Sequence, residues 1–258
     1  MQLGAMNHPQ HDLVEEIVWL ARAGYDFDDL TLEPPRARST DIDRVLVRTA
    51  LRETGLDAVG HTAWYLPIAA SFDGLREAAL TELVRCFDVF AQLGVTKVNV
   101  HPTTRLPMHD TETLLRANVE ALAYLTELAA ERGLRLMLEN LPGTFNRPAE
   151  LRRILDAVPN LGFHLDVGHA NLQTPTNLTE ELLAACGDRL LHVHLSDNFG
   201  GDADLHLPLG AGQIDWRWVV RALRRARYDG TITLEVFSPD RDYLLLSRDK
   251  LRRLWNES

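Results

Sequence analysis

The sequence predicts an α/β fold, a single-domain (β/α)8 TIM barrel that extends over residues 1–258. Two observations predict this fold. Strand-like and helix-like segments alternate along the whole chain, and no linker or low-complexity tract separates them. The strand–helix unit occurs eight times, the number that a closed barrel requires, whereas an open doubly wound sheet, the main alternative, does not require eight.

Eight short segments have the composition of buried parallel strands and end at turn residues or polar residues. The seventh, Leu-Leu-His-Val-His-Leu, shows the clearest apolar alternation, and the residues from Ser196 to Gly201 then break the strand. The fourth is ended by Pro102. In chain order, the predicted strands are residues 2–6, 25–32, 56–61, 96–101, 134–139, 162–166, 190–195 and 231–235.

The segments between the strands carry helix patterns and helix boundary signals. In the first helix, Leu13, Ile17 and Leu20 form one apolar stripe. Gly94 closes the long third helix, and Asp215 is placed to cap the seventh. In chain order, the predicted helices are residues 12–23, 40–54, 75–93, 111–132, 148–158, 179–186, 216–227 and 242–255.

Composition and charge limit the class of protein. With 258 residues, 45% of them hydrophobic and 25% charged, the chain resembles an ordinary soluble domain with a full core. No run approaches the ~20 apolar residues of a membrane span, and the N-terminus does not resemble a secretory signal. Cys86 and Cys186 lie inside helix patterns, so we expect reduced thiols and a cytoplasmic location. The net charge of −10 argues against a broad nucleic-acid-binding face.

Potential metal ligands gather at the predicted strand ends, where barrels of this type carry their active sites. Asp204 and His206 are two residues apart, so in an extended segment both face the same side. Imidazoles and carboxylates suit zinc, manganese or iron, and a cation would relieve the repulsion among four carboxylates in one mouth. The nine candidate ligands are His61, His101, Glu139, Asp166, His169, His194, Asp204, His206 and Glu235.

Other polar and aromatic residues near these ends have different predicted roles. His164 and His192 precede two ligands by two residues, on the same faces but deeper, so we interpret them as core or supporting groups. Trp64 follows His61 and could stack on a sugar or on a base. Arg105 and Arg147, in the loops after strands four and five, are candidate substrate-binding residues.

Several motifs together resemble the xylose-isomerase-like barrels, a superfamily of sugar (phosphate) isomerases and epimerases, inosose dehydratases and endonuclease IV. The resemblance covers essentially the whole chain. It rests on Val98-Asn-Val-His-Pro, Leu138-Glu-Asn, His164-Leu-Asp-Val-Gly-His, His192-Val-His-Leu-Ser-Asp-Asn, Asp204-Leu-His-Leu-Pro-Leu-Gly-Ala-Gly-Gln-Ile-Asp-Trp and Leu234-Glu-Val.

The resemblance implies different roles in two branches of the superfamily. In the epimerase branch, one divalent ion, often manganese, would be bound by Glu139, Asp166, His194 and Glu235. Glu139 and Glu235 would also act as acid and base, and His169 would contact a substrate oxygen. In the endonuclease IV branch, three zinc ions would share all nine candidates: His61, His101 and Glu139; Glu139, Asp166, His194 and Glu235; and His169, Asp204 and His206.

Neither branch matches in every respect. The first three connections offer only Arg36 and Arg38 as a basic pair, too few for tracking DNA phosphates. The arginine that tagatose-type epimerases place six residues after the seventh-strand histidine is replaced by Gly200.

We therefore expect a sugar or sugar-phosphate isomerase or epimerase that depends on one to three zinc or manganese ions. Its partner would be a small carbohydrate or polyol rather than nucleic acid or a membrane, and the sequence leaves the oligomeric state open. The alternative is an endonuclease IV-like zinc-dependent phosphodiesterase, and a third hypothesis is a metal-bound sugar sensor without catalysis.

Overall fold

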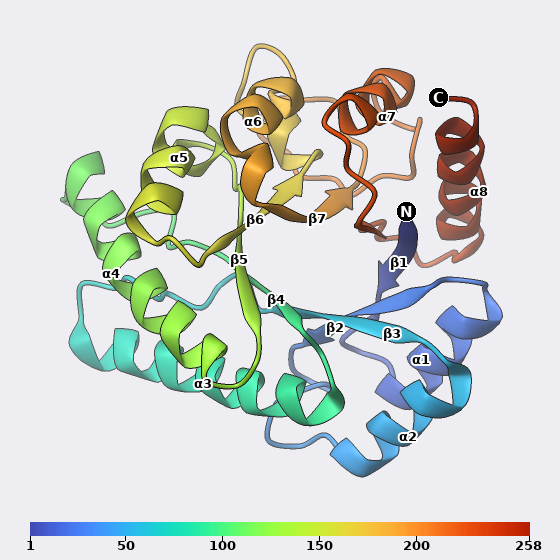
Figure 1. Ribbon diagram of the computed structural model, residues 1–258, viewed down its shortest axis with the longest axis horizontal. Coiled ribbons are helices and arrows are strands. Elements are labelled where there is room, and N and C mark those ends of the chain that lie inside the picture. The colour runs from blue at the N-terminus through green and yellow to red at the C-terminus, as the bar shows by residue number, and fades with distance from the viewer.

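A computed structural model describes residues 1–258 and contains eight parallel strands that close into a barrel in chain order. Each strand pairs with the next, and β1 (Gln2–Met6) closes the barrel by pairing with β8 (Thr231–Leu234), where Gln2 lies opposite Thr231. Eight helices surround the strands as an outer ring in the same order (Figure 1). The predicted (β/α)8 barrel is confirmed.

The observed strands agree with the predicted segments to within two residues at each end. Between β1 and β8 they are β2 (Phe27–Leu32), β3 (Asp57–Thr62), β4 (Lys97–Val100), β5 (Arg135–Glu139), β6 (Gly162–Asp166) and β7 (Leu190–Leu195). The helices are α1 (Leu13–Arg22), α2 (Arg44–Thr54), α3 (Asp73–Leu93), α4 (Thr111–Ala130), α5 (Pro148–Ala157), α6 (Thr179–Cys186), α7 (Trp216–Arg225) and α8 (Asp242–Asn256).

Aspartate side chains mark the start of several helices. Asp12, Asp43, Asp110 and Asp215 each precede a helix and accept backbone N–H groups of its first turn. Because Asp43 caps α2, this helix begins four residues later than the expected start at residue 40. The left-handed Gly94 ends α3 as predicted.

The barrel interior changes from apolar to polar along the strands. Near the N-terminal ends, Phe27, Val59 and Met137 are buried together. Gly4 permits this packing, because a Cβ atom there would lie 2.4 Å from the Phe27 ring. Farther along, the inward positions are polar, including Asp29 on β2 and Asn99 on β4, both buried. The apolar layer thus forms a floor, and polar side chains line the C-terminal half.

The connections after the strands carry little regular structure. Three short 3-10 helices occur, η1 (Thr144–Asn146), η2 (His169–Asn171) and η3 (Gly187–Arg189). In the β7–α7 connection, Asp197 and Leu207 form an isolated antiparallel bridge. Cys86 and Cys186 are buried and unpaired. None of the helices combines the length and the apolar character that crossing a bilayer would require.

Candidate functional site

A cavity of about 780 Å³ opens at the C-terminal ends of the strands, where the predicted ligands gather. Two of the nine, Asp166 and His194, are fully buried and contact lining residues, with Asp166 Oδ2 3.6 Å from His169 Nδ1 and His194 Nδ1 3.2 Å from Glu235 Oε2. The other seven line its wall: His61, His101, Glu139, His169, Asp204, His206 and Glu235. The structure therefore brings all nine candidate ligands to one mouth, although they come from six strand ends and two loops.

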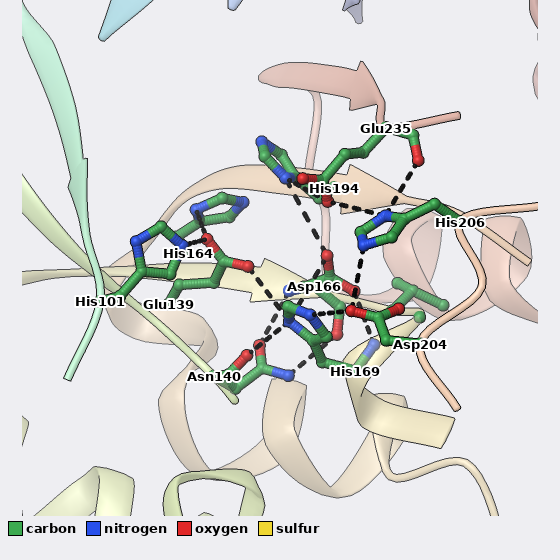
Figure 2. Close-up of polar contacts among 12 residues, drawn as sticks. His101, Glu139, Asn140, His164, Asp166, His169, His194, Asp204, His206 and Glu235 are labelled. Atoms are coloured by element: carbon green, nitrogen blue, oxygen red, sulfur yellow. Dashed lines mark hydrogen bonds and ion pairs between the residues drawn. The ribbon is translucent and has the colours of Figure 1, made fainter. Parts of the chain in front are cut away.

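Acidic and imidazole side chains alternate through the site, so that each carboxylate has an imidazole neighbour (Figure 2). His206 lies between two acids, with its Nε2 3.0 Å from Asp204 Oδ2 and its Nδ1 3.5 Å from Glu235 Oε2. His169 Nε2 also lies 3.0 Å from Asp204 Oδ2, and its Nδ1 lies 3.1 Å from Glu139 Oε1. This order limits repulsion among the carboxylates.

Three of the imidazoles have an additional polar contact that helps to fix the orientation of the ring. His194 Nε2 lies 2.6 Å from Asp29 Oδ2, and its Nδ1 lies 3.2 Å from Glu235 Oε2. The Nδ1 atoms of His169 and His206 lie within hydrogen-bond distance of the backbone carbonyls of Asn140 and Glu235. Hydrogen bonds of this kind, made by the ring nitrogen that does not bind the ion, typically fix the tautomer and orientation of metal-binding histidines.

A second group of ligands lies on the β3 and β4 side. His61, His101 and Glu139 each present a ligand atom within 4.8 Å of those of the other two. His101 Nε2 lies 3.0 Å from Glu139 Oε2. The Nε2 atom of His61 is buried and has no hydrogen-bond partner. Burial lowers the pKa of His61 to about 4, so this imidazole is neutral, as a ligand must be.

The charges of the site shift the pKa of its acids in opposite directions. Burial raises the pKa of Asp166 to about 7, although His169 opposes this effect. Burial would also raise the pKa of Glu235, but the neighbouring charges of His206 and His194 lower it to about 2. Despite burial, Glu235 and Asp204 raise the pKa of His206 to about 9. Protons on imidazoles thus balance the acids in the metal-free protein.

The residues fit a divalent ion. Asp166 Oδ2 is buried, has no hydrogen-bond partner and lies 4.0 Å from His194 Nδ1. Glu139, Asp166 and His169 present ligand atoms within 4.8 Å of one another, and so do His61, His194 and Glu235. Mixed imidazole and carboxylate ligands are those of zinc and manganese sites.

Three supporting residues were not among the predicted site residues. Asp29 lies in the middle of β2, and no strand-end rule would select it. Asn99 Nδ2 donates a hydrogen bond to Glu139 Oε2 at 2.6 Å. Asn140 accepts from the backbone N–H of Asp166 at 2.8 Å and donates to its carbonyl at 2.9 Å. Both asparagines stand in motifs beside predicted ligands, which was the available signal.

Asp197 organises the loop that carries Asp204 and His206. Its buried carboxylate accepts hydrogen bonds from the backbone N–H groups of Asn198, Gly210 and Ile214 and from the indole of Trp216. Gly212 permits this close approach, because a Cβ atom there would lie 2.4 Å from Asp197 Oδ1. One aspartate therefore holds the two ends of the connection together.

The predicted substrate-binding residues have different locations. Trp64 and Arg105 line the cavity. Arg147 is not among the residues that line it; its Nη1 lies 3.8 Å from Glu150 Oε1, and its side chain is exposed. His164, predicted to be a supporting group, is fully buried with its Nδ1 3.3 Å from Glu139 Oε2.

Comparison with known proteins gives relatives along most of the chain. The L-ribulose 3-epimerase of Methylomonas sp. (strain DH-1) is 30% identical over 257 residues, covering 94% of this chain and 85% of that protein. An uncharacterized protein of Methanocaldococcus jannaschii is 32% identical over 186 residues. That match covers 65% of this chain and 63% of the archaeal protein, so it spans less than two thirds of that relative's length.

Solved structures similar to this protein also cover essentially the whole chain. A D-tagatose 3-epimerase-like protein superimposes with a TM-score of 0.85 and 25% identity, covering 100% of this chain and 99% of that one. A Thermus thermophilus protein soaked with zinc chloride gives a TM-score of 0.77 and 26% identity, over 100% and 99% of the two chains. The sequence model of one family, described as xylose isomerase-like TIM barrel, matches residues 17–254. The chain therefore belongs to the xylose isomerase-like TIM barrel family.

Proposed function

We propose that this protein is a divalent-metal-dependent sugar isomerase or epimerase. The observation that carries the proposal is that Glu139, at the end of β5, and Glu235, directly after β8, line the same cavity from strands three apart in the closed barrel (Figure 2). Similarity to an L-ribulose 3-epimerase and to a D-tagatose 3-epimerase-like protein supports the substrate class. Glu139, Asp166, His194 and Glu235 would hold the ion.

The two glutamates would move the protons. A sugar carbon between them would meet one carboxylate on each face, because their strands are separated around the closed barrel and both side chains line the cavity. One glutamate would remove the proton from the carbon next to the carbonyl, and the other would return a proton to the opposite face. A bound divalent ion would polarise the carbonyl and so make this C–H bond more acidic. His169, which lines the cavity, would contact a substrate oxygen.

The proposal predicts turnover of ketoses by metal-loaded protein. Protein reconstituted with Mn²⁺ or Zn²⁺ should interconvert sugars such as L-ribulose, D-tagatose or D-allulose, and in D₂O it should introduce deuterium at the reacting carbon. Glu139→Gln and Glu235→Gln should each lower turnover by about 10²-fold to 10⁴-fold, because each removes an acid–base group. NMR of the sugar products measures both effects, and metal content is measured in parallel.

Glu120→Gln is the matched control, because Glu120 lies exposed on α4, away from the cavity. It should retain wild-type turnover. Wild-type turnover in metal-loaded Glu139→Gln and Glu235→Gln would contradict the proposed roles of these glutamates.

The additional ligands favour phosphodiester hydrolysis as a second candidate function. His61, His101, Asp204 and His206 exceed what one ion needs, and a multinuclear site can activate hydroxide against a phosphate. Against this candidate, Arg105 is the single arginine or lysine that lines the cavity. Elemental analysis separates the two, since one ion per chain favours the isomerase and two or three favour the hydrolase. Nicking of duplex DNA with an abasic site would establish the second.

The cellular location is part of the same proposal. Cys86 and Cys186 are buried and unpaired, which agrees with reduced thiols and supports a cytoplasmic enzyme.

A further inference from the structure

Glu33 is a carboxylate in the cavity wall that belongs to none of the ligand groups. It directly follows β2, is half-buried, and lines the same cavity as the ligands. Arg105 is the one arginine or lysine that lines the cavity with it. Divalent ions would neutralise the acids of the ligand groups, and Glu33 lies outside those groups.

Tyr65 is the polar neighbour of Glu33. Burial raises the pKa of Glu33, whereas His101 and the Tyr65 hydroxyl act in the opposite direction. In return, burial and the charge of Glu33 raise the pKa of Tyr65, which keeps the phenol protonated as a hydrogen-bond donor. Both side chains line the cavity, so its wall offers a carboxylate that accepts hydrogen bonds and a phenol that donates one.

Aromatic rings accompany this polar pair. The edge of Trp64 meets Tyr65 with 5.9 Å between ring centroids, and Trp64 remains largely exposed while lining the cavity. Phe237 is a second exposed ring in the lining. Aromatic faces pack against the C–H groups of a sugar, and a carboxylate can accept hydrogen bonds from two adjacent hydroxyls. The cavity lining that includes Glu33 thus has the chemistry of a subsite for hydroxyl groups.

The same wall disfavours a phosphate. Arg105 is the one arginine or lysine in the lining, and its side chain is exposed. A phosphate near Glu33 would bring two like charges together without a cation between them.

We propose that Glu33 and Tyr65 bind hydroxyls of the substrate away from the reacting carbons, and that the enzyme consequently selects uncharged ketoses over their phosphate esters. This inference rests on the proposed isomerase or epimerase function and specifies its substrate class.

Binding of matched sugar pairs tests the inference independently of catalysis. The probes are L-ribulose with L-ribulose 5-phosphate and D-tagatose with D-tagatose 6-phosphate, titrated calorimetrically into Mn²⁺-loaded protein. We expect the free sugar of at least one pair to bind tenfold or more tightly than its ester. Glu33→Gln should weaken binding of that sugar by about tenfold to hundredfold and should narrow or reverse the preference. Tyr65→Phe should weaken binding of the same sugar by a smaller factor, because this substitution removes a neutral hydrogen-bond donor.

The controls separate this inference from alternatives. Glu120→Gln should leave both affinities unchanged, and metal content should remain equal in all variants. Tighter binding of the esters, abolished by Arg105→Gln, would assign the subsite to a phosphate and overturn the inference. Unchanged affinities in Glu33→Gln, or no binding of either free sugar, would also overturn it. Binding with the expected preference but without turnover of any ketose would instead contradict the proposed function.

Discussion

Asp29 is a buried acid that contacts the predicted metal ligand His194 through the ring nitrogen opposite the one expected to bind the ion. Its Oδ2 lies 2.6 Å from His194 Nε2 and 3.6 Å from His192 Nε2. The negative charge favours the tautomer that keeps a proton on His194 Nε2, and so leaves Nδ1 free for an ion. We expect Asp29→Asn to weaken metal binding by about 10-fold to 100-fold, measured by competition with a chelator.

Asp28 supplies the matched control for this variant. Consecutive strand residues face opposite sides, so Asp28 faces away from the site, and burial raises its pKa well above the usual value. The near-isosteric Asp28→Asn should leave metal affinity unchanged. Equal metal affinities in Asp29→Asn and the wild type would show that His194 binds metal without the negative charge of Asp29 beside it.

The contrast between Asp29 and the nine ligands shows what could be predicted for single residues. Ligands at strand ends could be found because parallel strands in a barrel end at the same rim. Asp29 stands inside a strand, and its partner His194 is 165 residues away in the sequence. Nothing local distinguishes a buried acid with a distant partner from a surface acid. Arg147 illustrates the converse, since a position after a strand does not determine where a long side chain points.

The β7–α7 connection depends on Asp197 for its shape. Asp197→Ala would leave buried donors of Gly210, Ile214 and Trp216 without their acceptor. We expect the free energy of unfolding to fall by about 2–4 kcal/mol, because several charge-assisted hydrogen bonds are lost. We also expect metal content to fall, because this loop positions Asp204 and His206. Urea denaturation and elemental analysis measure the two effects.

Asp202→Asn is the control in the same loop, because Asp202 is exposed. It should change neither stability nor metal content. A stable Asp197→Ala variant with full metal content would mean that the loop is held mainly by its other contacts.

Whole elements were easier to predict than their boundaries. Apolar strands with polar ends recur through the chain, and β6, β7 and α6 coincide with the expected ranges. The starts of α1 and α2 were placed too early, because Asp12 and Asp43 are caps rather than helical residues. A cap and a first-turn acid have similar compositions, so the side-chain hydrogen bond decides between them.

The molecule as a whole assembles one site from distant parts of the chain. Strands β2, β3, β5, β6 and β7 and the residues directly after β4 and β8 each contribute an acid or an imidazole, and the apolar floor of Phe27, Val59 and Met137 lies nearer the N-terminal ends of the strands. The barrel core can stabilise this concentration of ionisable groups only while protons or ions balance the acids. Metal binding and folding stability should therefore be coupled, since an ion that binds the folded state stabilises it.

This coupling should depend on pH with a definite sign. The pKa of His206 is raised from 6.5 to about 9, so its contribution to stability is present below pH 6.5 and is lost as pH rises through 9. Asp166, whose pKa is raised from 3.8 to about 7, acts in the same direction at lower pH. The metal-free protein should therefore lose stability between pH 6.5 and 9.

Removing the metal at two pH values tests this expectation. A bound ion favours the deprotonated forms of both groups, so the increase in Tm on adding Mn²⁺ should be larger at pH 9 than at pH 6.5. The same free Mn²⁺ concentration is used at both pH values, because the stabilisation depends on the ratio of that concentration to Kd and Kd should be lower at the higher pH. Calorimetry of metal-free and loaded protein at constant ionic strength measures the increments. His109→Gln, at an exposed position before α4, should leave the difference between the two Tm increments unchanged. His206→Gln should make this difference smaller. An increment that is equal or smaller at the higher pH would mean that ion binding does not displace these protons.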